Sequence, residues 1–191
     1  MERQIKSKAR VTDFGEVYTA KKQVVDMVDL VDQAISEIGA TVLEPACGNG
    51  NFLVEILERK IKAAINTNNF EKNLLLAVSS VYGVDIQKDN VQECRGRLYK
   101  KILKYFPYPT AEFEKILRFV LSKNIMCANT LTMLDNKGRP MVVSEWEVRD
   151  NGTVVRKEVL FSDMVDNGGE STHNIHTYYY RWKSEESRLT A

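Results

Sequence analysis

The sequence has few cysteines, no long apolar run and no excess of charge of either sign, and each absence removes a class of protein. Its three cysteines, Cys47, Cys94 and Cys127, are far apart and not in Cys-x-x-Cys spacing, which predicts neither disulfides nor a zinc site. No segment approaches the roughly 20 apolar residues that cross a bilayer, and the polar N-terminus shows no secretory signal. We therefore expect a cytoplasmic protein with no membrane segment and no bound metal.

The formal net charge of +1 means that no overall electrostatic field draws the chain onto nucleic acid. Any such contact must be local. One predicted helix is rich in basic residues, which fits a phosphate-binding face or, more simply, a solvated one. These residues are Lys88, Arg95, Arg97, Lys100, Lys101 and Lys104. The two histidines, His173 and His176, have no cysteine or acid in register and predict no metal site.

Helical and strand patterns alternate in the first two thirds of the chain. Apolar residues at steps of three and four predict five helices, the first with Met27 and Val31 on its buried stripe. The helices span residues 21–38, 52–65, 70–78, 88–106 and 110–121. Short apolar runs at residues 41–43, 81–86 and 124–128 predict strands. This order implies right-handed crossovers and an α/β fold, with a mostly parallel sheet and helices on both faces.

The last fifty residues follow a different pattern. Residues 141–144 predict another strand, and residues 147–161 predict a hairpin that turns at Asp150-Asn151-Gly152. From residue 166 the composition is polar and poorly periodic, which predicts a loosely ordered tail. We therefore divide the chain into an N-terminal arm (1–20), one domain (21–165) and a tail (166–191).

The most informative segment is Glu44-Pro45-Ala46-Cys47-Gly48-Asn49-Gly50-Asn51-Phe52, which joins a predicted strand to a predicted helix. Its two glycines let the backbone approach a ligand, although glycines alone also fit an ordinary strand-to-helix turn. Asp85 ends the next strand, where an acid can accept ribose hydroxyls and Ile86 can pack on a base. The alternative for Asp85 is an acid at a helix N-terminus. Ligands bind at the carboxyl ends of such strands, which predicts one crevice for Glu44, Asp85 and Asn129.

These motifs resemble those of the N6-adenine DNA methyltransferases, which include modification subunits of restriction-modification systems. Gly15-Glu16-Val17-Tyr18-Thr19-Ala20 is similar to their N-terminal cofactor motif, with Ala20 in place of the usual proline. Residues 44–52 are similar to their Asp-Pro-Ala-Cys-Gly-Ser-Gly motif, Asp85 to their ribose acid, and residues 127–131 to the segment that contacts adenine. Asn129 stands where that family commonly has Asp. The resemblance covers roughly residues 10 to 145.

The resemblance implies a Rossmann-like methyltransferase fold that binds S-adenosyl-L-methionine. The residues that it assigns to the cofactor are Gly15, Tyr18, Thr19, Glu44, Pro45, Ala46, Gly48, Gly50, Phe52, Asp85, Ile86 and Asn129.

The family's catalytic tetrapeptide, Asn/Asp-Pro-Pro-Tyr/Phe, is absent from this sequence. Ser144-Glu145-Trp146 aligns with it, so that Trp146 can stack on a flipped base while Ser144 or Glu145 accepts its amino hydrogen. The simpler alternative is a strand that continues into the hairpin with Trp146 packed on the sheet. No base is placed to activate Cys47 as a nucleophile.

We therefore expect a chain that binds S-adenosyl-L-methionine and acts on double-stranded DNA in a complex. A partner methyltransferase or restriction subunit would capture the base and provide DNA specificity. Two alternatives remain open. One is a non-enzymatic regulatory or assembly subunit that keeps the fold, and the other is a complete but divergent adenine methyltransferase.

Overall fold

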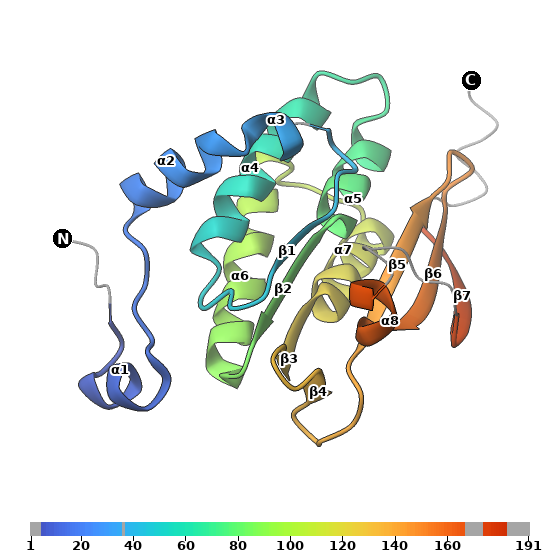
Figure 1. Cartoon of the computed structure of the whole chain (residues 1–191). Helices are drawn as coiled ribbons and strands as arrows, with labels where there is room; N and C mark the ends of the chain where they lie inside the picture. Colours follow the sequence, from blue (N-terminus) through green and yellow to red (C-terminus); the bar gives the residue numbers. More distant parts are fainter. Residues whose placement is uncertain (1–4, 36, 167–173, 183–191) are drawn as a thin grey trace.

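The computed structural model describes residues 5–35, 37–166 and 174–182, and contains two sheets with helices packed around them (Figure 1). The larger sheet has the order β1-β2-β3-β4. Its strands β1 (Val42–Glu44), β2 (Val81–Asp85) and β3 (Ile125–Asn129) are parallel, and the short β4 (Leu134–Asp135) runs antiparallel to β3. The predicted α/β fold with a parallel sheet is confirmed, whereas β4 was not predicted.

Helices cover both faces of this sheet. The helices α4 (Asn51–Ile65) and α6 (Lys88–Tyr105) lie on one side, and α5 (Phe70–Ser79) and α7 (Ala111–Asn124) on the other (Figure 1). Neighbouring residues of β2 point to opposite faces of the sheet. Gly83 faces Leu53 of α4, whereas the hydroxyl of Tyr82 donates to the Ser144 carbonyl, 2.7 Å away on the other face. Thr110 caps α7 as predicted, since its hydroxyl accepts the Phe113 N–H.

The second sheet consists of β5 (Val142–Val148), β6 (Thr153–Leu160) and β7 (His176–Arg181), all antiparallel. The hairpin predicted at residues 150–152 is confirmed. The strand predicted at residues 141–144 continues through Trp146 and belongs to this sheet, not to the parallel one. The prediction of a loosely ordered tail is wrong for β7, where the Tyr180 ring packs 4.9 Å from the ring of Phe119. His173 lies outside the described residues.

The N-terminal third also differs from its prediction. The single helix predicted over residues 21–38 is wrong, because α2 (Lys21–Leu30) ends at Val31 and a short α3 (Asp32–Ile35) follows. Met27 and Val31 are 52% and 47% exposed, so the buried stripe is narrower than the spacing suggests. A helix that was not predicted, α1 (Lys8–Phe14), begins after Ser7, whose hydroxyl accepts the Arg10 N–H. The helix α8 (Phe161–Asp166) follows β6.

A buried lysine holds the turn that leads into β1. Lys60 is 1% exposed, and its Nζ donates to the carbonyls of Glu37, Ile38 and Ala40 at 3.0, 3.1 and 2.7 Å. Burial lowers the pKa of Lys60 to about 8. Lys60 of α4 therefore fixes the start of β1 and, with it, the loop that follows.

An ion pair between α4 and α6 gives a testable pH dependence. Glu58 lies 2.6 Å from Lys101 Nζ and accepts the Tyr105 hydroxyl, and although burial alone would raise its pKa, these partners lower it to about 2. Because the pKa of Glu58 is lowered in the folded state, its ionised carboxylate stabilises that state at pH values above the ordinary pKa of about 4.5. This contribution is lost as the pH falls toward 2. We expect Glu58→Gln to reduce the free energy of unfolding at pH 7 by about 1–2 kcal/mol, after allowing for solvent screening.

Urea denaturation at a series of pH values measures this effect. The gap between Glu58→Gln and the parent chain should narrow steadily below pH 4.5. A gap that is the same at pH 7 and pH 3 would show that the carboxylate charge is not the cause.

Among the described residues, no helix combines the length and the apolar character that a membrane crossing needs. Within the same ranges, no three His, Cys, Asp or Glu side chains are grouped as a metal ion requires.

Candidate functional site

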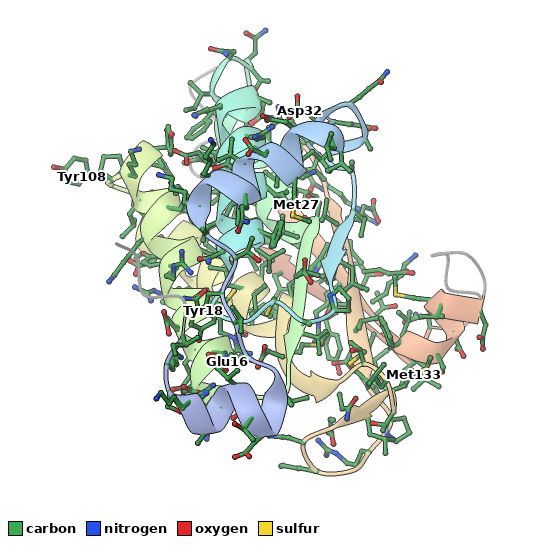
Figure 2. The ribbon with its side chains drawn as sticks, turned by 60° about the vertical axis from the view of Figure 1, so that its left-hand side comes forward. Glu16, Tyr18, Met27, Asp32, Tyr108 and Met133 are labelled. Atoms are coloured by element: carbon green, nitrogen blue, oxygen red, sulfur yellow. The ribbon has the colours of Figure 1, made fainter. Side chains whose placement is uncertain are left out.

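A pocket of about 630 Å³ opens at the carboxyl ends of β1, β2 and β3. Four segments line it, namely residues 15–19 of the arm, the loop after β1, residues 85–87 and residues 128–131. Of the twelve residues that the sequence assigns to a cofactor, eleven line this pocket, and Gly50 does not. Figure 2 shows Glu16 and Tyr18 on the arm segment between α1 and α2, facing the body of the protein. The fold thus brings together positions that are more than a hundred residues apart.

The two glycines of the loop have different roles. The loop continues the β1–β2 pairing through the bond from Cys47 N–H to the Val84 carbonyl and then turns at two residues with positive φ, Gly48 (53°) and Gly50 (88°). A Cβ on Gly48 would lie 3.3 Å from the ring of Tyr18, so this glycine allows the arm to close over the loop. A Cβ on Gly50 would lie only 2.5 Å from Cys94 Sγ, so this glycine seats the start of α4 on α6.

Asp85 ties the loop to the start of α6. Its Oδ2 accepts the Gly48 N–H at 3.0 Å, and its Oδ1 accepts the Gln87 N–H at 2.7 Å and the Asn90 side-chain amide at 3.3 Å. A carboxylate offers about four acceptor positions, so about one remains for a ligand. A ribose hydroxyl would use that position or displace the long bond from Asn90. Asp85 therefore both holds a helix start and faces the pocket.

Glu44 and Asn129, the other two polar residues at the strand ends, differ in how many of their acceptor positions already take part in hydrogen bonds. Glu44 makes one long bond, from the Ala46 N–H at 3.4 Å, so most of its acceptor capacity faces the pocket. The Oδ1 of Asn129 accepts the N–H groups of Leu131 and Thr132 at 2.9 and 3.3 Å, which holds its own turn. Asn129 stands where the resembling family commonly has Asp, but its oxygen serves this turn, and its amide N–H groups are what it offers to a ligand.

An ionic network docks the arm on the start of α6. Arg10 pairs with Glu16 and Asp89, each at 2.6 Å, and the buried Asn90 donates to Glu16 at 2.9 Å. The hydroxyl of Tyr18 lies 2.9 Å from Asn90 Oδ1 and 3.1 Å from Glu16 Oε1. Burial would raise the pKa of Glu16, but the hydrogen bonds from its partners hold it below its ordinary value. The network places the Tyr18 ring against the glycine loop.

Sequence reasoning missed Arg10 and Asn90. Asn90 follows Asp85 by five residues and lies in the first turn of the next helix, so its side chain returns to the strand end. That spacing is a signal that could have identified Asn90. Arg10 could not be found in this way, because its partner Asp89 lies 79 residues further along the chain.

We expect Arg10→Gln to loosen the arm and to weaken ligand binding in the pocket about fivefold, because ordering the arm would then oppose binding. Limited proteolysis and an S-adenosyl-L-methionine titration measure the two effects. The control is Arg118→Gln, which breaks an exposed Arg–Glu pair (2.8 Å) within α7. Equal protease resistance and affinity in the two variants would show that the arm network does not organise the pocket.

Ser144, Glu145 and Trp146 do not line this pocket. The Trp146 indole N–H donates to Asn124 Oδ1 at 2.7 Å, and its ring meets that of Phe119 edge-on. Ser144 is 2% exposed and accepts a bond from Arg156 at 2.7 Å. The sequence aligned these residues with the crevice, but β5 lies on the face of the parallel sheet that α5 and α7 cover. Ser144 and Trp146 are held there in packing contacts, and Glu145 is half-buried.

Cys47 has no nucleophilic character. Its hydrogen bond with Cys94 and its burial both raise the pKa of its thiol, so it stays protonated at neutral pH. Its small side chain packs beside Gly83 of β2, which is a structural role.

Comparisons with known proteins point to methyltransferases. No protein-family model and no solved structure matches the chain. A stretch of 84 residues, 44% of this chain, is 31% identical to part of the Type II methyltransferase M.VspI of Vibrio sp. (strain 343). The match spans only 16% of the length of that enzyme. The chain is therefore similar to a part of a Type II methyltransferase, and this similarity supports a methyltransferase-like role.

Proposed function

We propose that the chain is the S-adenosyl-L-methionine-binding part of a DNA (adenine-N6) methyltransferase of the restriction-modification class. The observation that carries this proposal is the single pocket shared by the arm, the glycine loop, Asp85 and Asn129. The similarity to a Type II methyltransferase supports the methyltransferase class. Adenine as the target rests on the order of the motifs, with the arm motif ahead of the glycine loop.

The pocket offers complementary surfaces for this cofactor. The half-exposed Ile86 presents an apolar surface for an adenine ring, next to the Asp85 carboxylate at the ribose position. Glu44 brings a second carboxylate, which suits the positively charged amino group of the cofactor. When bound, S-adenosyl-L-methionine supplies the methyl group, and these residues would orient it.

Ultraviolet cross-linking with methyl-labelled S-adenosyl-L-methionine tests cofactor binding. We expect label on this chain, removed by excess S-adenosylhomocysteine and kept in excess ATP. Absence of label, or equal competition by ATP, would contradict the proposal.

We further propose that a partner subunit supplies base capture, with a strand that pairs to β1. Among the described residues, β1 pairs only with β2. The N–H of Val42 bonds to the Ser80 carbonyl at 2.9 Å, so the polar groups of Leu43 point away from β2, and the Leu43 side chain is 41% exposed. Such an edge is a template for another strand, and ligands in doubly wound sheets bind where two halves of the sheet meet.

Leu43→Pro tests this edge, because proline removes only the outward N–H. We expect the variant to keep S-adenosyl-L-methionine binding and to lose methyl transfer to double-stranded DNA in the presence of the partner subunit. Unchanged transfer by the variant would contradict pairing at β1.

The same transfer assay distinguishes the alternatives. Label on DNA with this chain alone would show a complete, divergent enzyme. A stable complex with the partner subunit, unaffected by substitutions at Gly48 and Gly50 and inactive on DNA, would show a regulatory or assembly subunit.

A further inference from the structure

A second cavity, of about 620 Å³, lies between β3, the first half of α6, the end of α7 and the second sheet. It is distinct from the cofactor pocket, and the two share Ala128 of β3 in their walls. Figure 1 shows the elements that surround it, with β3 and β4 on one side and β5 and β6 on the other.

Positive charge is in excess around this cavity. Its lining contains five cations, Lys88, Arg95, Lys123, Arg139 and Arg156, and two carboxylates, Asp135 and Glu158. Both carboxylates are already neutralised. Asp135 pairs with Arg139 at 2.7 Å, and Glu158 pairs with Arg156. Three cations, Lys88, Arg95 and Lys123, remain without a carboxylate partner among the described residues.

Arg95 is the most informative of the three. Its guanidinium is half-buried and bonds to backbone carbonyls only, to Ser122 at 2.7 Å and to Ile125 at 2.9 Å. Burial lowers its pKa, because no acid in the described chain compensates its charge. Charged groups that leave water are normally paired, so this wall of the cavity favours an anion.

The two lysines extend the positive surface over two helices. Lys88 is exposed at the first residue of α6. Lys123 lies near the end of α7, with its Nζ 5.4 Å from the centre of the Phe119 ring. Of the basic residues that the sequence places on one helix, Lys101 and Lys104 instead contact Glu58, and Arg97 bonds to the Asn49 carbonyl. Of the remaining three, Lys88 and Arg95 border this cavity, and the exposed Lys100 lies outside it.

We propose that this cavity binds backbone phosphates of double-stranded DNA, an inference that rests on the proposed function. Guanidinium and ammonium groups are the usual protein ligands of phosphate. Since the net charge of the chain is only +1, attraction to DNA must come from a local group such as this one. The shared wall at Ala128 places the phosphates beside the pocket from which a methyl group would be delivered.

The test compares two double variants of the full chain. Lys88→Gln/Lys123→Gln removes two cavity charges, and Lys100→Gln/Lys115→Gln removes two exposed charges from the same helices outside the cavity. The probe is a 20-base-pair duplex, a length of about two helical turns. We expect the first variant to bind it about tenfold more weakly than the parent chain. The slope of log affinity against log salt concentration should also be smaller by about 2. The second variant should change little. Lys88→Arg/Lys123→Arg should retain binding, and excess AMP should not displace the duplex.

Equal loss in both glutamine variants, displacement by AMP, or no binding of duplex by the parent chain would overturn the proposal. Cross-linking of S-adenosyl-L-methionine to the same proteins keeps the two proposals separate. If the cofactor still cross-links but Lys88→Gln/Lys123→Gln weakens duplex binding no more than the control variant does, only the phosphate site is overturned. If Lys88→Gln/Lys123→Gln specifically weakens duplex binding but the cofactor does not cross-link, only the cofactor proposal is overturned.

Discussion

Replacing Gly50 with alanine is expected to lower the free energy of unfolding by about 2–4 kcal/mol and to abolish ligand binding in the pocket. Gly50 has φ of 88°, which side-chain-bearing residues rarely adopt. The new Cβ would also lie 2.5 Å from Sγ, 3.3 Å from Cβ and 3.5 Å from the backbone Cα of Cys94, which is fully buried. Relief of this contact requires α4 to shift from α6, and that shift displaces the glycine loop. Urea denaturation measures the loss.

Gly96→Ala is the matched control for this substitution. Gly96 lies within α6, and a Cβ there meets no atom within 4 Å. Alanine should therefore stabilise the chain by about 0.5–1 kcal/mol, because it restricts the unfolded chain and favours helix. Similar stabilities for the two variants would contradict the role assigned to Gly50.

Asp85→Ala should weaken S-adenosyl-L-methionine binding by more than about tenfold, as expected when a half-buried acceptor of several hydrogen bonds is lost. The substitution removes the acceptor of the Gly48 and Gln87 N–H groups and of the Asn90 amide. It also removes the carboxylate that we propose accepts the ribose hydroxyls. A titration of the purified variant measures the affinity, and its stability is measured in parallel.

Asp135→Ala provides the control for Asp85. Asp135 is also a carboxylate at a strand end that accepts backbone N–H groups, those of Lys137 and Arg139 at 2.8 and 2.9 Å, but it lies outside the cofactor pocket. Its loss should leave the affinity for S-adenosyl-L-methionine unchanged. If both variants bind equally well, Asp85 holds the loop but does not contact the cofactor.

Local pattern predicted much of the α/β part of the fold. The strands ending at Glu44, Asp85 and Asn129 lie close to the predicted positions, because short apolar runs between amphipathic helices indicate buried parallel strands. The common edge of these strands followed from topology alone. The loop residues and Asp85 could be placed at this pocket because they follow their strands, whereas Gly15, Tyr18 and Thr19 were assigned to it only by the resemblance to the methyltransferase family.

Long-range contacts decided what the sequence could not predict. The position of β5 depends on bonds from Trp146 to Asn124 and from Tyr82 to Ser144, which join residues 22 and 62 positions apart. At the break after α2, Arg59 of α4 bridges the two short helices by pairing with Asp29 and Asp32 at 2.6 and 2.8 Å. The spacing of apolar residues within one segment cannot predict contacts between residues so far apart in the sequence. The same holds for Gly50, whose packing role depends on Cys94.

Isothermal titration of the parent chain with S-adenosyl-L-methionine shows whether the pocket at the strand ends binds this cofactor. We expect saturable binding in the micromolar range, competed by S-adenosylhomocysteine and strongly weakened by Asp85→Ala. A folded parent chain that gives no binding heat and no competition would contradict it.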